Sequence, residues 1–458
     1  MEAKQYLKWY QKVAYGAGDL GSNFMYTFVS SFLLIYLTDT IGLNAGIIGT
    51  LMLISKIFDG FTDVVFGTLV DRTRSKMGKA RPWMFWSTFP LAICEVLLFM
   101  TPTVSANLQY AYFFIVYTLL NAIFYTANNI SYASLTALIT RNPNERVQLG
   151  SIRFIFAITA AVIISSITVG LVNLFGGGVA GWRMVAIVFS ALMILFNMIS
   201  VLSIREVPPE EKPNQANMTK TSLLSNLKHL VTNRYYLLIL FYYIVMYSVS
   251  GISTGIGIYY CTYTLNNPAL LGLFTIISLV PVIIGLVATP FLVKRWGIYK
   301  VNLYGAIASL IFGIPAIIAG YAGNIPLLLL FSGLRGLGTS PMVGTLNALI
   351  ADTATHTYLK DGVHLEGTMY SCSSMGIKVG GGIGSALCGW LLYLGGYNGL
   401  AATQTAGAIN MINFMYLGVP LIGGAISLII VSALNVDKAN KKLLAASAQA
   451  GGTVTNSI

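Results

Sequence analysis

The chain has 458 residues, of which 56% are hydrophobic and only 9% are charged. A soluble domain carries roughly 25% charged residues, so this composition excludes a soluble globular protein, and the abundance of apolar residues excludes a disordered one. The net charge is +12, but the basic residues lie in short loops between apolar runs. That pattern is typical of a membrane protein, so no nucleic-acid partner is expected.

Apolar runs of the length that crosses a bilayer, about 20 residues, recur along the chain. We predict an all-α integral membrane protein with twelve transmembrane helices in two six-helix bundles. The predicted spans are 17–38, 45–70, 82–102, 108–140, 151–176, 183–204, 235–262, 268–293, 301–321, 325–352, 368–395 and 407–434. The first run has no cleavage site of the kind that follows a signal peptide, so we expect a retained span.

The loops between these spans alternate in charge. The segment 71–81 carries five basic residues, whereas the loops 101–107, 265–271, 320–326 and 394–410 contain neither lysine nor arginine. Basic loops stay on the cytoplasmic side of a membrane. We therefore predict that both termini are cytoplasmic.

A polar segment divides the chain into two halves of six spans. The predicted parts are an N-terminal bundle at 1–204, a central cytoplasmic loop at 205–234, a C-terminal bundle at 235–436 and a cytoplasmic tail at 437–458. This is the layout of a major facilitator transporter, in which substrate binds between the halves near the bilayer midplane.

Ionisable residues within spans are costly in lipid, so each is a candidate functional residue. They are Asp19, Lys56, Asp59, Asp63, Glu95, Arg335, Asp352 and Lys378. Asp59 and Asp63 are four residues apart, so they share a helix face with Thr62 and repel each other. A bound cation or proton would relieve that repulsion, and the alternative is an ion pair with Lys56 or Lys378.

Two further ionisable residues have other interpretations. We expect Glu95 to be a buried hydrogen-bonding partner within the first bundle. Arg335 lies among glycines that favour close helix packing, and it contacts either a polar substrate or carbonyl groups of a neighbouring helix.

Several short motifs are spread along the predicted spans and loops. Tyr15–Asn23 begins the first span, Asp59–Asp63 lies in the second, Gly67–Arg74 enters the basic loop, Glu145–Leu149 precedes Arg153, Ala351–Thr353 ends the tenth span, and Glu366-Gly367 precedes Lys378. Each motif alone is weak, but their combination resembles the glycoside–pentoside–hexuronide:cation symporters, and this resemblance covers essentially the whole chain.

The resemblance implies two binding sites. The implied cation site consists of Asp59, Thr62, Asp63 and Thr126, with Asp59 and Asp63 as metal ligands if the ion is Na⁺. The implied sugar site is drawn from Ser22, Asn23, Tyr125, Asn129, Arg153, Ser374 and Lys378. We also predict that Asp71 and Arg72 gate the cytoplasmic side.

The chain departs from the melibiose-transporting branch of that family. Asn23 and Asn129 stand where that branch has carboxylates. An amide both donates and accepts hydrogen bonds and carries no charge, so we expect Arg153 and Lys378 to be less neutralised. A neutral xyloside or oligosaccharide then fits, and a hexuronide is permitted. Asp19 lies one turn before Asn23, and we do not expect it to replace the missing acid.

The predicted function is cation-coupled symport, with H⁺ or Na⁺, of a glycoside, pentoside, hexuronide or small oligosaccharide by alternating access. We expect a monomer in a bacterial cytoplasmic membrane, with no cofactor and no enzymatic activity. Two alternatives stay open: a lysolipid or amphiphile carrier on the same scaffold, and a sugar sensor that does not transport.

Overall fold

The structure is a computed structural model that describes residues 5–207, 230–363 and 369–449. These residues are helical and contain no β-strand, apart from one isolated bridge between Ser75 and Gly78. The chain forms two compact units. The first contains Met1–Glu211, Gly251–Ile276 and Gly382–Tyr416, and the second contains Lys212–Ser250, Ile277–Gly381 and Leu417–Ile458. The predicted domain boundaries stay a prediction, and most of the predicted central loop lies outside the described residues.

Each predicted span overlaps a helical run, and three of these runs begin or end eight or nine residues outside the predicted limits. The first half contains α1 (Trp9–Ile35), η1 (Tyr36–Thr40), α2 (Ala45–Arg72), α3 (Arg81–Leu98), α4 (Ala106–Thr118), η2 (Leu119–Tyr125), α5 (Thr126–Leu138), α6 (Pro143–Leu174) and α7 (Gly178–Ser203). The second half contains α9 (Arg234–Tyr259), η3 (Tyr260–Thr264), α10 (Leu270–Trp296), α11 (Ile298–Tyr321), α12 (Ile325–Asp361), α14 (Ser371–Leu394), α15 (Ala406–Asn413), η4 (Phe414–Gly418), α16 (Val419–Ala433) and α17 (Val436–Gln449).

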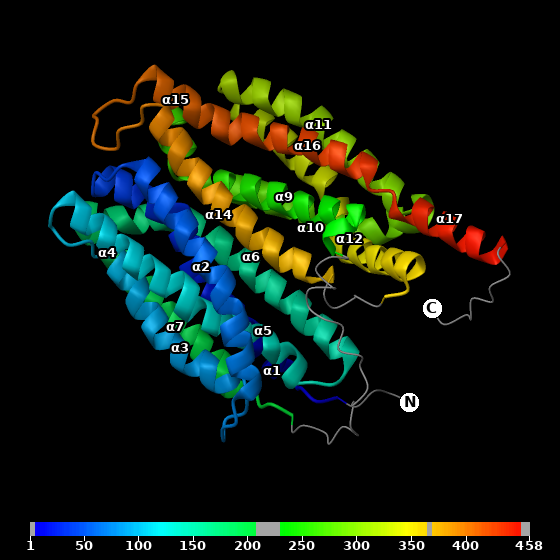
Figure 1. Ribbon diagram of the computed structural model, residues 1–458. Coiled ribbons are helices and arrows are strands. Elements are labelled where there is room, and N and C mark those ends of the chain that lie inside the picture. The colour runs from blue at the N-terminus through cyan, green and yellow to red at the C-terminus, as the bar shows by residue number, and fades with distance from the viewer. Residues whose placement is uncertain (1–4, 208–229, 364–368, 450–458) are drawn as a thin grey trace. The chain divides into compact units, whose positions relative to one another are not determined.

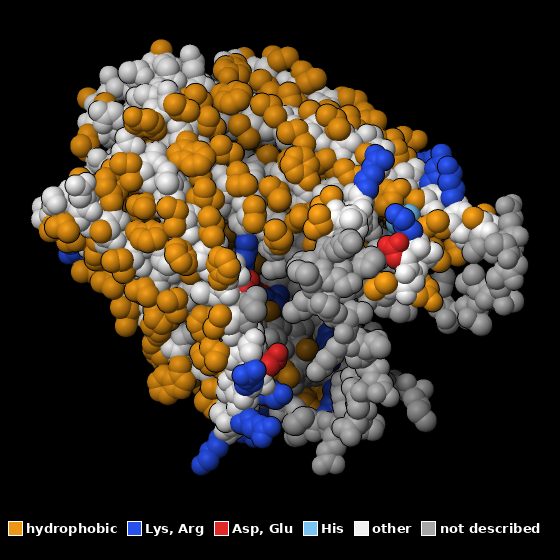
Figure 2. Space-filling model, viewed as in Figure 1, with side chains coloured by type: hydrophobic (Ala, Val, Ile, Leu, Met, Phe, Trp, Pro, Cys, Tyr) orange, Lys and Arg blue, Asp and Glu red, His pale blue; other side chains and the backbone are white. Residues whose placement is uncertain are grey.

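Eleven helices of the described chain are long and apolar enough to cross a membrane. The predicted span 82–102 corresponds to α3, which is a helix of 18 residues but falls outside that set. Twelve spans and the side on which the termini lie therefore stay predictions. Hydrophobic side chains cover much of the visible surface of the helices, as expected where lipid is the solvent (Figure 2).

Local sequence determines where several helices begin. The Asn44 side chain accepts hydrogen bonds from the amides of Gly46 and Ile47, which caps α2. The Glu206 carboxylate accepts from the amides of Lys79, Ala80 and Arg81 at 2.8–3.0 Å and caps α3. A carboxylate at a helix N-terminus is favoured by the exposed N–H groups there. This contact holds the loop after the predicted gating residues Asp71 and Arg72 against the segment that follows α7.

Helix α1 lies at the centre of the first half, packed between α6 and α7 (Figure 1). Glycines allow this close approach. A Cβ on Gly16 would lie 2.4 Å from the Ile152 side chain of α6, and one on Gly18 would lie 2.7 Å from the Tyr132 ring of α5. Small residues at helix contacts are typical of membrane proteins, because they let backbones approach. The sequence Tyr15–Asn23 is thereby held against α5, α6 and α7.

Four helical segments widen into single π turns: η1, η2, η3 and η4. The η2 segment joins α4 to α5, so the predicted span 108–140 is one continuous helical run from Ala106 to Leu138. Such π turns interrupt the regular hydrogen bonding of a helix and are frequent at functional sites. Here η2 carries Asn121 and Tyr125, and η1 carries Asp39.

The second unit is built around α11 and α12, which pack along each other, with α16 against α11 and α17 against α12. A buried amide–hydroxyl pair joins the first two: Asn302 donates to Thr345 at 2.8 Å. Burying a polar pair with both partners satisfied avoids the cost of an unpaired group in lipid.

Candidate functional site

The carboxylate of Asp59 lies at the centre of the predicted cation site. Its side chain is 7% exposed, and it accepts a hydrogen bond of 2.6 Å from the Thr126 hydroxyl. The Lys56 ammonium lies 3.7 Å from the other carboxylate oxygen and also donates to the Asn121 amide at 3.3 Å. The structure thus brings Asp59 and Thr126 together, and it adds Lys56 as the basic partner that the ion-pair interpretation required.

The other two predicted cation-site residues lie on the same helix. The Thr62 hydroxyl donates to the backbone carbonyl of Asp59 at 3.1 Å, so its proton is used within α2. Asp63 is half-buried one turn beyond Asp59. The Thr126 hydroxyl lies within hydrogen-bonding distance of the Asn121 carbonyl as well, at 3.0 Å, which ties the carboxylate to the π turn η2.

The guanidinium of Arg153 on α6 forms an ion pair with Asp19 on α1. Its Nε lies 2.5 Å and its Nη2 lies 3.4 Å from the carboxylate oxygens, and Nη1 lies 3.3 Å from the Thr136 hydroxyl. The pair is partly buried, with side-chain exposures of 22% for Arg153 and 13% for Asp19. The prediction that Arg153 is left less neutralised is therefore wrong, because the Asp19 carboxylate pairs with its guanidinium.

Two buried tyrosines hold the arginine in place. The Arg153 guanidinium lies over the Tyr132 ring, 4.3 Å from its centre, and 5.9 Å from the centre of the Tyr15 ring. The two tyrosines bond to each other reciprocally, each hydroxyl donating to the other's backbone carbonyl at 2.7–2.9 Å. Arginine has five N–H donors, and three of them are used here.

One face of α1 combines charge, amide and aromatic groups. Asp19, Asn23 and Tyr26 are spaced i, i+4 and i+7, so they lie on one side of the helix. Tyr26 is exposed and stacks on Tyr125 of η2, with ring centres 5.7 Å apart. The sequence prediction included Tyr125 and missed Tyr26, although the helical spacing from Asn23 would have indicated it.

The remaining predicted sugar-site residues of the first unit differ in accessibility. The Asn23 amide is half-buried and donates to the Asp19 carbonyl at 2.8 Å. Asn129 is exposed one turn after Tyr125. The Ser22 hydroxyl is buried without a hydrogen-bond partner in the part of the chain that the structure describes. Asn23 and Asn129 are thus placed to meet a ligand, and Ser22 is less so.

Two other predicted sugar-site residues belong to the second unit. Ser374 is exposed and Lys378 is half-buried, both on α14. Arg335 is half-buried on α12, near Gly313 of α11. Glu366 and Gly367, which precede Lys378 in the sequence motif, lie outside the described residues.

Glu95 occupies the position that the sequence predicted. It is buried inside the first unit, where its carboxyl group is 2.7 Å from the Ser190 hydroxyl of α7. The predicted gating residues Asp71 and Arg72 are exposed at the end of α2, and neither forms an ion pair with another described residue. Their role stays a prediction.

A cluster around Asp39 was missed by the sequence analysis. Its carboxylate accepts hydrogen bonds of 2.6–2.7 Å from the hydroxyls of Thr38, Tyr263 and Tyr397. Tyr259 is hydrogen-bonded to Thr38 at 2.8 Å. Burial raises the pKa of the Tyr397 hydroxyl above its ordinary value, so this group stays protonated and donates. The cluster joins η1 to η3 and to the segment after α14.

This cluster should control access to the neighbouring Cys261, which is fully buried. In protein that keeps Cys261 as its only cysteine, we expect the Tyr263→Phe/Tyr397→Phe variant to react with maleimide at least about tenfold faster. Each lost hydrogen bond to a charged group is worth about 1.5–3 kcal/mol. Tyr112→Phe, which removes a tyrosine bond to the Leu97 carbonyl, is the control. Equal labelling rates in the parent protein, the double variant and the control would show that the Asp39 cluster does not restrict access to Cys261.

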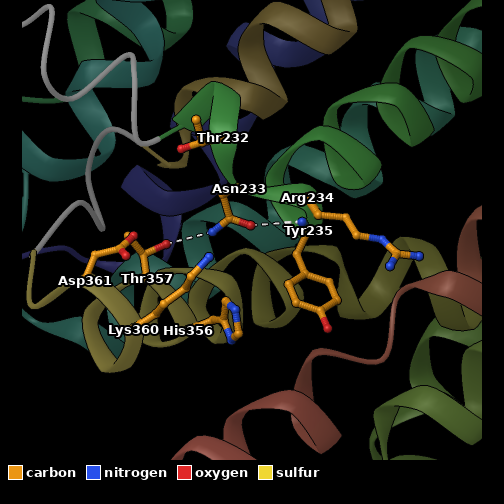
Figure 3. A pocket seen from close by; sticks show the side chains of 8 residues that line it. All are labelled: Thr232, Asn233, Arg234, Tyr235, His356, Thr357, Lys360 and Asp361. Carbon is orange, nitrogen blue, oxygen red and sulfur yellow. Dashed lines mark hydrogen bonds between the residues drawn. The ribbon is translucent and has the colours of Figure 1, made fainter.

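A small polar pocket lies elsewhere, at the ends of α9 and α12 in the second unit (Figure 3). Its volume is about 100 Å³, below the roughly 300 Å³ at which ligand pockets begin. Asn233 donates to Thr357 at 2.7 Å and caps α9, and His356 is hydrogen-bonded to Asn440 at 2.9 Å. These groups serve the protein's own packing, so the pocket is not a glycoside site.

The long apolar helices of the described residues are those of an integral membrane protein. The chain is similar to a solved bacterial homologue of the human lysosomal transporter Spinster in an inward-facing and unoccupied conformation. That similarity has a TM-score of 0.66 at 13% identity, covering 96% of this chain and 98% of that one. At this identity the likeness concerns the fold alone.

The chain belongs to the MFS/sugar transport protein family, which it matches over residues 14–438. It is 30% identical to the isoprimeverose transporter of Lactiplantibacillus pentosus over 96% of this chain and 92% of that protein. It is 29% identical to a putative glycoside/cation symporter of Escherichia coli (strain K12), over 90% and 88% respectively. The predicted resemblance to glycoside–cation symporters is confirmed, and the protein is a multi-pass transporter of a bacterial cytoplasmic membrane.

Proposed function

We propose that this protein is a proton-coupled symporter of an uncharged glycoside. The observation that carries the proposal is the junction of the two candidate sites in η2 and α5. Thr126 bonds to Asp59 of the cation site, and the preceding residue, Tyr125, stacks on Tyr26 of the sugar site. Asn129 follows one turn later. A change at Asp59 is thereby transmitted to the aromatic and amide groups through one short helical segment.

Protonation of Asp59 would alter this junction directly. The ionised carboxylate accepts from Thr126 and attracts Lys56. A protonated carboxyl group becomes a donor and loses its attraction for the lysine. The Thr126 hydroxyl and η2 are then free to shift. Because coupling is reciprocal, a sugar that favours the shifted arrangement raises the affinity for the proton by the same factor.

The contacts of Asp59 favour a proton over Na⁺. Both of its oxygens already have partners, and one of these is the Lys56 ammonium. A metal ion needs several oxygen ligands at once, and here it would lie beside another positive charge. A proton needs only one oxygen. Asp63, one turn away, is the second carboxylate able to share it.

The Asp19–Arg153 pair favours an uncharged sugar. Its two charges cancel, and Asn23 and Asn129 add uncharged amide groups. Tyr26 and Tyr125 offer aromatic faces for the apolar side of a sugar ring. An anionic sugar would compete with Asp19 for the arginine, so a hexuronide is disfavoured.

Alternating access would require the hydrogen bonds of the Asp39 cluster to break when its end of the transporter opens. We retain Asp71 and Arg72 as the proposed gate at the far end of α2. Uptake of labelled glycosides, with and without Na⁺ and at several pH values, tests the proposal. Uptake that is stimulated by an inward proton gradient in Na⁺-free medium is expected. A strict Na⁺ requirement, or uptake of hexuronides alone, would overturn it.

Asn129 provides a prediction about the sugar site alone. Losing a hydrogen-bonding partner of a ligand typically costs about 1–3 kcal/mol, so Asn129→Ala should weaken glycoside binding roughly tenfold. Titration of purified protein with its preferred glycoside measures this. Asn144→Ala, which removes an exposed amide at the start of α6, is the matched control. Native affinity in Asn129→Ala would place the sugar site elsewhere.

A further inference from the structure

A basic groove lies in the second unit where α10 passes into α11 and α17 runs alongside. Its volume is about 590 Å³, and its lining includes Trp296, Tyr299, Lys300, Lys438, Lys441 and Lys442. The transport function uses none of these residues. Figure 2 shows basic side chains gathered around α17.

The three lysines of α17 are held on one face of that helix. Lys438, Lys441 and Lys442 are spaced i, i+3 and i+4, so they point the same way. The opposite face is anchored by Asn440, which donates to the Asp352 carbonyl of α12 at 2.9 Å and is hydrogen-bonded to His356. The helix therefore cannot turn its lysines away from the groove without losing these buried bonds.

The charge of the groove is strongly unbalanced. Four of its lining residues are lysines, and Asp437 is its one acidic lining residue in the described chain. Asp437 pairs with Lys441 at 2.7 Å, and both are exposed, so solvent weakens that pair. Arg295 lies just outside, over the Trp296 ring at 5.7 Å. An anion entering the groove would meet several uncompensated positive charges.

We propose that this groove binds the phosphodiester headgroup of an anionic phospholipid. Trp296 is exposed and packs edge-on against Tyr304, 6.1 Å away, as interfacial aromatic residues do beside headgroups. The helices that run from the groove carry exposed apolar side chains, including Phe291 of α10 and Ile311 of α11. A lipid satisfies both features, because its phosphate meets the lysines while its acyl chains lie along the apolar surface. This inference does not depend on the proposed transport function.

Native mass spectrometry of the full chain in detergent, with added phosphatidylglycerol or phosphatidylcholine, tests the site. We expect one phosphatidylglycerol to be retained in preference to phosphatidylcholine. Each basic residue near an anionic headgroup raises the binding affinity by a factor of about five. K438Q/K441Q/K442Q should therefore weaken lipid retention by up to about a hundredfold. The matched control R74Q/K76Q/K79Q removes the same charge from the loop after α2 and should retain the lipid.

The charge-conserving variant K438R/K441R/K442R separates binding from folding, because it should retain the lipid as the wild type does. Equal retention of the two lipids, or equal loss in both glutamine variants, would overturn the proposal. Inorganic phosphate is added as a competitor. Displacement of the lipid by millimolar phosphate would assign the groove to a soluble anion instead.

Discussion

Asp59→Asn should abolish uphill accumulation of sugar while leaving exchange of sugar across the membrane. The amide accepts a hydrogen bond from Thr126 but binds no proton, so the sugar-contacting groups survive and the coupling is lost. With one pH unit imposed, transfer of one proton per sugar supports at most about tenfold accumulation. The variant should reach a ratio of about one, measured with labelled sugar in proteoliposomes.

Glu95→Gln is the matched control for this result. Glu95 is also a buried carboxyl group within the first unit, and it bonds to a single hydroxyl, that of Ser190. An amide preserves that bond, so accumulation should remain near the wild-type ratio. Wild-type accumulation by Asp59→Asn would show that this carboxylate does not carry the coupling proton. Loss in both variants would indicate a general effect of altering buried carboxyl groups.

Asp19→Asn should change the charge preference of the sugar site. Removing the carboxylate leaves the Arg153 guanidinium without its counter-charge beside Tyr132, and breaking one partner of such a pair costs more than removing both. We expect affinity for a neutral glycoside to fall at least about tenfold, which is about 1.4 kcal/mol. A glucuronide, whose carboxylate replaces that of Asp19, should become the better competitor.

Two companion variants make this prediction specific. Asp19→Glu keeps the negative charge and should keep the preference for uncharged sugars. Asp19→Asn/Arg153→Gln removes both charges, so it should fold at least as well as Asp19→Asn yet gain no affinity for the glucuronide. The measurement is competition against binding of a labelled neutral glycoside. An unchanged ratio of neutral to anionic affinity in Asp19→Asn would contradict the assigned role of the pair.

Much of the fold could be predicted because helices that are solvated by lipid need long apolar runs, which are easily recognised in the sequence. Uninterrupted apolar runs mark helices, and the run before Leu138 is long enough for one helix and too short for two. The π turns inside these runs could not be predicted, since a π turn changes hydrogen bonding without changing hydrophobicity. For the same reason the widened segment η2, which joins the two candidate sites, has no signature in the sequence.

The sequence supplied candidate residues for the site, but it could not supply the way in which they pair. The spacing of Asp59 and Asp63 indicated a shared face, and the family resemblance supplied Thr126, which the structure places on Asp59. The Asp19–Arg153 pair depends on how closely α1 approaches α6, which sequence spacing cannot give. Asp39 was not among the candidates because it lies at the edge of an apolar run. The free-energy cost of a carboxylate is lower there than in the middle of a span, so its presence does not by itself indicate a function.

The most direct test of proton-coupled symport is the internal pH of proteoliposomes in Na⁺-free medium when a glycoside gradient is the only driving force. Sugar entering with a proton should acidify the interior of vesicles that contain the wild-type protein. Vesicles with Asp59→Asn, which still admit the sugar down its gradient, should show no pH change. Sugar entry without acidification in the wild-type protein, or acidification that appears equally with Asp59→Asn, would contradict coupling through this carboxylate.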